Sequence, residues 1–254
     1  MNKTITIKTD SDMKKMKEGG EKLARVRKVL ADKTKVGVNA AEIEELACEL
    51  IKKEGGKPSF KMVPSYHWAT CVNVNEGIVH GIPKKSLVFK KGDIVSIDLG
   101  IFYKGFHNDT SISVAISPSK ETEKFMKAGE KALEKAIAQA IPGNRIYDIS
   151  KAMEDTLKDN NLEPMRTLVG HGIGRELHEY PQIPCFVSTK RENTPLIPEG
   201  ATFAIEVMYT IGSPEIEIEE DGWTIKVKSD KISGLFEETV AISSNGPIVL
   251  TKIN

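Results

Sequence analysis

Residues 91–116, KGDIVSIDLGIFYKGFHNDTSISVAI, predict a β-hairpin around which the rest of the chain is organised. Residues 94–103 are almost all apolar or small, as in a strand that is buried on both faces. The return strand alternates apolar with small polar residues from 111 to 116. The dipeptide Lys104-Gly105 between them supplies the turn.

Two carboxylates lie on one face of this predicted hairpin. With a two-residue turn, Asp98 lies opposite Ser111, and Asp109 lies on the same face, diagonal to Asp98. A lone Asp in a strand usually lies at an edge or on the surface. Two carboxylates on one buried face repel each other and lose hydration. The hairpin therefore predicts a bound cation.

Composition excludes several classes of protein. The 254 residues suffice for one large domain or two small ones, and 36 basic residues balance 36 acidic ones. No net charge attracts nucleic acid or an anionic membrane. The three cysteines, Cys48, Cys71 and Cys185, form no CxxC motif, which fits a reducing compartment. No apolar run of 18 residues and no signal peptide is present, so a cytoplasmic protein without a membrane partner is expected.

The spacing of apolar residues predicts four helices in two pairs, bounded by Gly, Pro or Asn. They run from about Asp10 to Gly37, from Asn39 to Gly55, from Lys120 to Ala140 and from Asn144 onward. Residues 3–8 predict a short strand or an arm.

The two helix pairs also suggest an internal duplication. Each has a similar turn (VGVN and IPGN) and is followed by a histidine segment (VHGIP and GHGIG) and strands. This pattern predicts a single domain, residues 1–254, with two similar halves, about 10–118 and 119–254. Helix pairs joined by Gly or Pro turns are also common without duplication.

Further acidic residues interrupt apolar strand segments. Glu206 lies in ATFAIEVMYT and Glu237 in LFEETVAI. A single such Glu normally faces solvent. With Asp98 and Asp109, however, they carry four negative charges, which two divalent cations neutralise. Together with one imidazole from the glycine-rich GHGIGRELHEYP, this set favours manganese, iron, cobalt or zinc.

Five segments in this order resemble the type I methionine aminopeptidases in their short bacterial form, which are pita-bread metallopeptidases of family M24. The segments are HGIP (80–83), IDLGIFYKGFHNDTS (97–111), GHGIGRELHEYP (170–181), AIEVM (204–208) and FEET (236–239). The resemblance implies an α/β (α+β) pita-bread fold, in which a curved antiparallel sheet of two pseudo-twofold halves is covered by helices.

The resemblance also implies the site. The implied metal ligands for two divalent ions are Asp98, Asp109, His171, Glu206 and Glu237. Glu206 is also the implied proton shuttle, whereas Glu238 points to the other face of its strand. The implied catalytic imidazoles, which face the substrate, are His80 and His178. The implied walls of the methionine pocket are Tyr66, Cys71 and Trp223. His67 and His107 are interpreted as caps or surface groups.

The implied activity is removal of the N-terminal methionine from peptides and nascent chains, including chains at the ribosome. A metal-bound hydroxide attacks the first peptide bond, small second residues are favoured, and the enzyme is expected to be a monomer. The chain departs from the family at four positions. Leu177 (commonly Phe) and Val63 (Tyr) bear on the shape of the pocket, Val207 (Pro) alters the stiffness of the local backbone, and Glu238 (His) adds a negative charge near the site.

Two alternatives remain from the sequence. One is another pita-bread exopeptidase of the Xaa-Pro type, which typically carries an extra N-terminal domain. The other is a non-catalytic pita-bread binding protein, which typically lacks some of the metal ligands.

Overall fold

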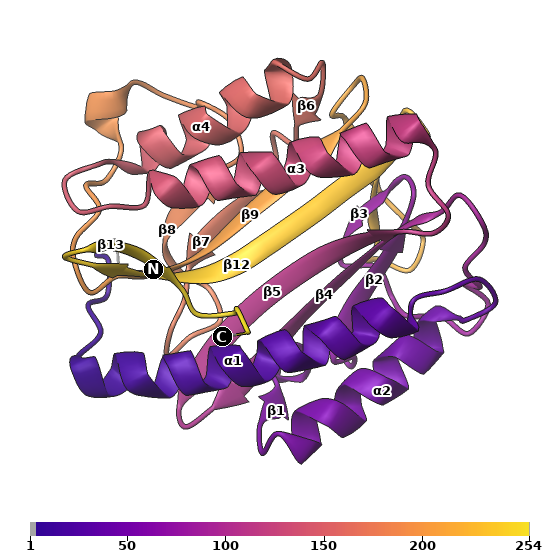
Figure 1. Ribbon diagram of the computed structural model, residues 1–254, viewed down its shortest axis with the longest axis horizontal. Coiled ribbons are helices and arrows are strands. Elements are labelled where there is room, and N and C mark those ends of the chain that lie inside the picture. Colours follow the sequence, from indigo (N-terminus) through magenta and orange to yellow (C-terminus); the bar gives the residue numbers. More distant parts are fainter. Residues whose placement is uncertain (1–3, 254) are drawn as a thin grey trace.

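The computed structural model describes residues 4–253 and shows an antiparallel sheet covered by four α-helices (Figure 1). The helices are α1 (Asp10–Lys33), α2 (Ala40–Lys53), α3 (Lys120–Ala138) and α4 (Ile146–Lys158), with 3₁₀ turns η1 (Phe60–Met62) and η2 (Arg191–Asn193). Among the described residues, no helix is both long and apolar enough to cross a membrane.

Within residues 4–253, thirteen strands complete the fold. They are β1 (Lys57–Pro58), β2 (Thr70–Val74), β3 (Gly77–Val79), β4 (Ile94–Tyr103), β5 (Phe106–Ala115), β6 (Glu163–Pro164), β7 (Val169–Gly172), β8 (Glu179–Pro184), β9 (Thr202–Thr210), β10 (Ile216–Ile218), β11 (Ile225–Val227), β12 (Ser233–Ser243) and β13 (Gly246–Val249).

The main sheet runs in the order β1-β4-β5-β12-β9-β7-β8, with β2 beside β4, β6 beside β9 and β13 beside β12. Strands β10, β11 and β3 form a small second sheet. Helix α1 packs on β4 and β5, and α3 packs on β9 and β12 (Figure 1). Apolar residues of these helices and strands are buried between the two layers. Two helix pairs therefore cover neighbouring parts of one sheet; the division into similar halves stays a prediction.

The β4–β5 hairpin has the predicted register. Asp98 lies opposite Ser111 and Gly100 opposite Asp109. Lys104 and Gly105 both have positive φ (48° and 87°), as a two-residue type I′ turn requires. The prediction that both carboxylates lie on one face of a buried hairpin is therefore confirmed.

Strands β5 and β12 meet at the centre of the sheet. Their ladder pairs are Glu237–Ser111 and Glu238–Thr110. On one side of these pairs, the Ser113 hydroxyl bonds the backbone of Leu235 (2.9 Å). On the other side, the Thr239 hydroxyl bonds the backbone of Asp109. Side-chain hydroxyls thus take the place of ladder bonds at this join, which we call the β5–β12 seam.

Several predicted boundaries were wrong by a few residues. Helix α1 ends at Lys33 rather than Gly37, because Thr34 is extended and its hydroxyl bonds the Leu30 carbonyl. Helix α3 ends at Ala138 rather than Ala140. Helix α4 begins at Ile146, because the Asp148 carboxylate caps the backbone N–H of Arg145 (2.8 Å).

The segment before α1 forms an arm. Residues 4–9 contain no strand, and Lys8 donates its backbone N–H to the Gly200 carbonyl (2.8 Å). Of the two alternatives for residues 3–8, the arm is therefore correct for residues 4–8; residue 3 lies outside the described part.

Candidate metal centre and substrate pocket

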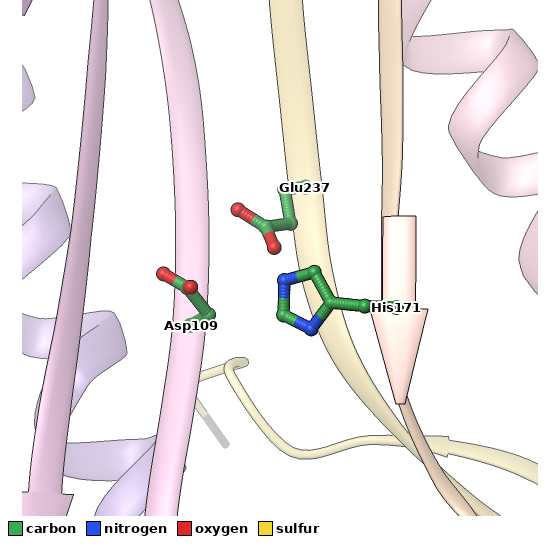
Figure 2. Close-up of side chains that lie close together, drawn as sticks. All are labelled: Asp109, His171 and Glu237. Carbon is green, nitrogen blue, oxygen red and sulfur yellow. The ribbon is translucent and has the colours of Figure 1, made fainter. Parts of the chain in front are cut away.

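Four neighbouring strands carry the predicted carboxylates, and all four line one pocket with His171: Asp98 on β4, Asp109 on β5, Glu206 on β9 and Glu237 on β12. Potential ligand atoms of Asp109, His171 and Glu237 all lie within 4.8 Å of one another. These three side chains point toward one another from three strands (Figure 2).

Burial and mutual repulsion change the acidity of the carboxyls. Burial raises the pKa of Asp98 to about 7. The pKa values of Asp109, Glu206 and Glu237 also lie well above their usual range, first because of burial and then because the negative charges repel one another. Asp98 Oδ1 is buried without a hydrogen-bond partner in the part of the chain described. Four neighbouring carboxylates, one of which has an oxygen without a hydrogen-bond partner, fit a site for a divalent cation.

His171 has the geometry of a neutral imidazole ligand. Its Nδ1 lies 2.9 Å from the Gly172 carbonyl, so Nδ1 carries the proton and Nε2 keeps its lone pair. Burial lowers the pKa of His171 to about 3, which keeps the ring neutral. A Cβ on neighbouring Gly170 would lie 2.6 Å from the Ala204 carbonyl and 3.3 Å from Glu206 Cγ. Glycine at 170 therefore lets β7 approach β9 closely, with His171 paired to Ala204.

The pocket has a volume of about 380 Å³ and a partly aromatic wall. Tyr66 and Trp223 pack edge to face with ring centroids 5.1 Å apart. The Tyr66 hydroxyl donates to the Thr70 carbonyl (2.9 Å), so the ring presents an apolar surface beside Cys71. Among the positions that depart from the family, Val63 and Leu177 both line this wall.

His80 and His178 also line the pocket. His80 has φ of 57°, a left-handed conformation that is uncommon for a residue with a side chain and concentrates at functional sites. The His178 ring centroid lies 4.5 Å from that of His171. Burial lowers the pKa of His178, so this ring is neutral near pH 7. Both imidazoles therefore offer N–H donors without adding positive charge beside a metal.

The other two histidines lie apart from this group. His67 is exposed, as interpreted from the sequence. The interpretation of His107 as a cap or surface group was wrong, because it is buried, with Nδ1 2.9 Å from the Ser59 hydroxyl. Burial lowers its pKa to about 4. The flanking residues 106–111 are mostly polar, so the sequence pattern contained no signal for this burial.

Glu238 lies on the other face of β12 from Glu237, as the alternation of a strand predicts. It does not line the pocket and instead pairs with Arg27 of α1, at 2.8 Å. This pairing could not be predicted from the sequence, because the two residues are far apart along the chain.

The N-terminal arm contacts the loop before His178 through an ion pair that was not predicted from the sequence. Lys8 Nζ lies 2.7 Å from Glu179 Oε2, and both side chains are almost fully buried. Glu179 Oε1 accepts the backbone N–H groups of Arg175 (2.8 Å) and Glu176 (3.3 Å). The arm therefore holds the turn that carries His178.

The chain belongs to metallopeptidase family M24, which it matches over residues 14–244. Membership of this family makes it a hydrolase that binds divalent metal, and the resemblance seen in the sequence is confirmed.

Within the family, its relatives are methionine aminopeptidases. The methionine aminopeptidase of Aquifex aeolicus is 35% identical, over 98% of this chain and 99% of its own length. Methionine aminopeptidase 1 of Bacillus subtilis is also 35% identical, over 98% of this chain and its whole length. The crystal structure of the methionine aminopeptidase from Thermotoga maritima has a TM-score of 0.95 and 38% identity, and covers 98% of this chain and 100% of its own.

A more distant solved structure shares the fold alone. The prolidase from Pyrococcus furiosus has a TM-score of 0.76 at 22% identity, and the match spans 66% of that chain. These neighbours confirm the predicted fold class, a mixed α/β pita-bread fold.

Proposed function

We propose that the chain removes the N-terminal methionine from peptides and nascent proteins, favouring small second residues. The observation that carries this proposal is a group of four carboxylates and one imidazole, buried or half-buried, that lines one pocket with a partly aromatic wall. Methionine aminopeptidases that match nearly the whole chain support the same substrate.

Five side chains hold the metal in this proposal. The proposed ligands are Asp98, Asp109, His171, Glu206 and Glu237. Their four negative charges suit two divalent ions, of which manganese, iron, cobalt and zinc fit a carboxylate-rich set with one imidazole. When bound, such ions polarise a scissile carbonyl and lower the pKa of a water.

The chain's own residues complete the reaction. Glu206 accepts the proton of the attacking water and delivers it to the leaving amine. His178 and His80 donate N–H groups to the scissile peptide, and His178 stabilises the oxygen on which negative charge develops. Tyr66, Cys71 and Trp223 enclose the methionine side chain.

A Met-Ala-Ser peptide, assayed with and without a chelator, tests the proposal. Chelator-sensitive release of methionine is expected. No release with any of the four metals would favour a non-catalytic binding protein, and cleavage of Xaa-Pro peptides alone would favour the prolidase-type alternative. We also propose a monomer acting in the cytoplasm on emerging chains, including those at the ribosome.

Substrate scope gives a first prediction. Met-Ala and Met-Ser peptides should turn over readily, whereas Met-Lys and Met-Phe peptides should be poor substrates. The resemblance to type I methionine aminopeptidases implies a closed pocket beyond the scissile bond, which would leave no room for large second side chains. Steady-state kcat/KM for this peptide series measures the preference, and equal values for Met-Lys and Met-Ala would contradict it.

Metal removal should change how stability depends on pH. The four carboxyls have pKa values in the folded, metal-free chain above the value of about 4 expected in an unfolded chain. The folded chain then binds more protons, so its free energy of unfolding falls as pH rises from about 4 through the Asp98 pKa of about 7. Added Mn²⁺ should therefore raise the melting temperature more at pH 8 than at pH 5, measured by circular dichroism against a chelated control. An equal rise in melting temperature at both pH values would contradict this expectation.

A further inference from the structure

A buried ion pair lies on the sheet face opposite the candidate metal ligands. Arg27 Nη1 of α1 lies 2.8 Å from Glu238 Oε1 of β12, and the side chains are 16% and 17% exposed. Desolvating two such charges offsets most of their attraction, so a pair in this position adds little to stability as a rule. Glu238 follows Glu237 in β12 and points to the opposite face of the sheet. This location suggests that the ion pair has a role other than stabilising the fold.

The guanidinium bonds the backbone of the seam. Arg27 Nη1 donates to the Thr110 hydroxyl and, at 3.4 Å, to the Glu237 carbonyl. The Thr110 hydroxyl donates to that same carbonyl (2.9 Å), and the Thr110 backbone N–H donates to Asp109 Oδ1 (3.0 Å). Arg27 and Thr110 together connect two proposed metal ligands on two strands.

Glu238 reaches Asp109 by a second route. Its Oε2 accepts the Thr251 hydroxyl, which in turn accepts the Thr239 backbone N–H (2.9 Å). The Thr239 hydroxyl accepts the Asp109 N–H (2.9 Å) and donates to the Asp109 carbonyl (2.8 Å). Arg27 Nη2 closes the network by donating to the Thr251 carbonyl (3.1 Å).

We propose that Arg27 and Glu238 are a positioning pair that sets the spacing of Asp109 and Glu237 across the β5–β12 seam, and thereby the affinity for metal. This inference rests on the proposed metal ligands. The ladder at the seam is short, so the distance between these ligands depends on side-chain hydrogen bonds. Arginine suits the task because its planar fork donates to several acceptors in fixed directions. Partners behind metal ligands typically change metal affinity by about 10- to 100-fold.

Four variants test the pair: Arg27→Met, Arg27→Lys, the double variant Arg27→Met/Glu238→Gln, and Lys22→Met. Arg27→Met leaves Glu238 buried without its partner, so it is at risk of folding poorly. The double variant removes both charges and keeps the test decisive. Lys22→Met is the matched control, because Lys22 also lies on α1 and pairs with Glu54 at 18% and 23% exposure. Calorimetry with Co²⁺ and the visible absorption of the Co²⁺-loaded protein report on the site without reference to peptidase activity.

The double variant should bind Co²⁺ about tenfold more weakly and show an altered Co²⁺ spectrum. Arg27→Lys should lose less Co²⁺ affinity than the double variant, because lysine keeps the positive charge but not the planar guanidinium. Lys22→Met should bind as the parent does. Parent-like Co²⁺ binding by the double variant, or equal weakening by Lys22→Met, would overturn the inference. A parent protein that binds no Co²⁺ would instead refute the proposed function.

Discussion

Replacing Glu237 by Ala is expected to abolish turnover and to remove at least one of the two proposed metal-binding events. Glu237 lies between Asp109 and Glu206, with Asp109 on one neighbouring strand and Glu206 directly opposite on the other. Glu237 would hold metal from this central position, so its loss would leave the bound ions poorly neutralised. Isothermal calorimetry with Mn²⁺ and the release of methionine measure the two effects.

The metal-free form of this variant gives an internal control. Burial and four neighbouring carboxyls raise the pKa of Glu237, so its charge destabilises the metal-free fold. Glu237→Ala should therefore melt no lower than the parent at pH 8 in the presence of chelator. Glu238→Gln should retain both binding events with weaker affinity. If Glu238→Ala removed metal binding and Glu237→Ala preserved it, the assignment of the ligand on β12 would be wrong.

Replacing His178 by Ala is expected to lower kcat by about 10²-fold, the effect of losing one donor to a developing oxyanion. His178 lines the pocket beside His171, and its neutral ring donates without repelling a metal. Because the proposed ligands do not include His178, metal stoichiometry should stay unchanged. Steady-state kinetics on Met-Ala-Ser measure kcat, and calorimetry measures the metal stoichiometry.

His107→Ala is the matched control for that variant. His107 is buried behind the pocket against Ser59 and does not line the pocket. Its removal should lower the melting temperature, because a buried side chain is lost, yet leave kcat within a few-fold of the parent. Comparable losses of kcat in both variants would mean that the histidine facing the substrate is misassigned.

The sequence predicted the parts of the site that follow from local alternation. The register of Asp98 and Asp109, and the opposite orientations of Glu237 and Glu238, both follow from the two-residue period of a strand and were confirmed. Helix ends were less accurate. The Thr34 hydroxyl ends α1 before the expected Gly37, and the Asp148 carboxylate caps Arg145, after the expected Asn144.

Contacts between distant segments could not be predicted. The arm residue Lys8 and the helix residue Arg27 reach Glu179 and Glu238 only in the folded chain, and neither lies in a recognisable motif. His107 was misplaced for a related reason: it was interpreted as a cap or surface group, whereas the Phe102 ring and Ser59, which is distant in the sequence, cover it.

The β5–β12 seam has a consequence for the kinetics of folding. The Thr110 hydroxyl and the Glu237 carbonyl that it bonds are 127 residues apart, and Arg27 is 210 residues from the same carbonyl. Contacts of such long sequence separation form slowly, because much of the chain's entropy is lost before they are made. On one side of the seam β5 pairs with β4, and on the other side β12 pairs with β9. These two pairs of strands are able to assemble before the seam closes. A divalent ion held by Asp109 and Glu237, the proposed ligands on the two sides of the seam, would then stabilise only the chain in which the seam has closed and would slow its reopening.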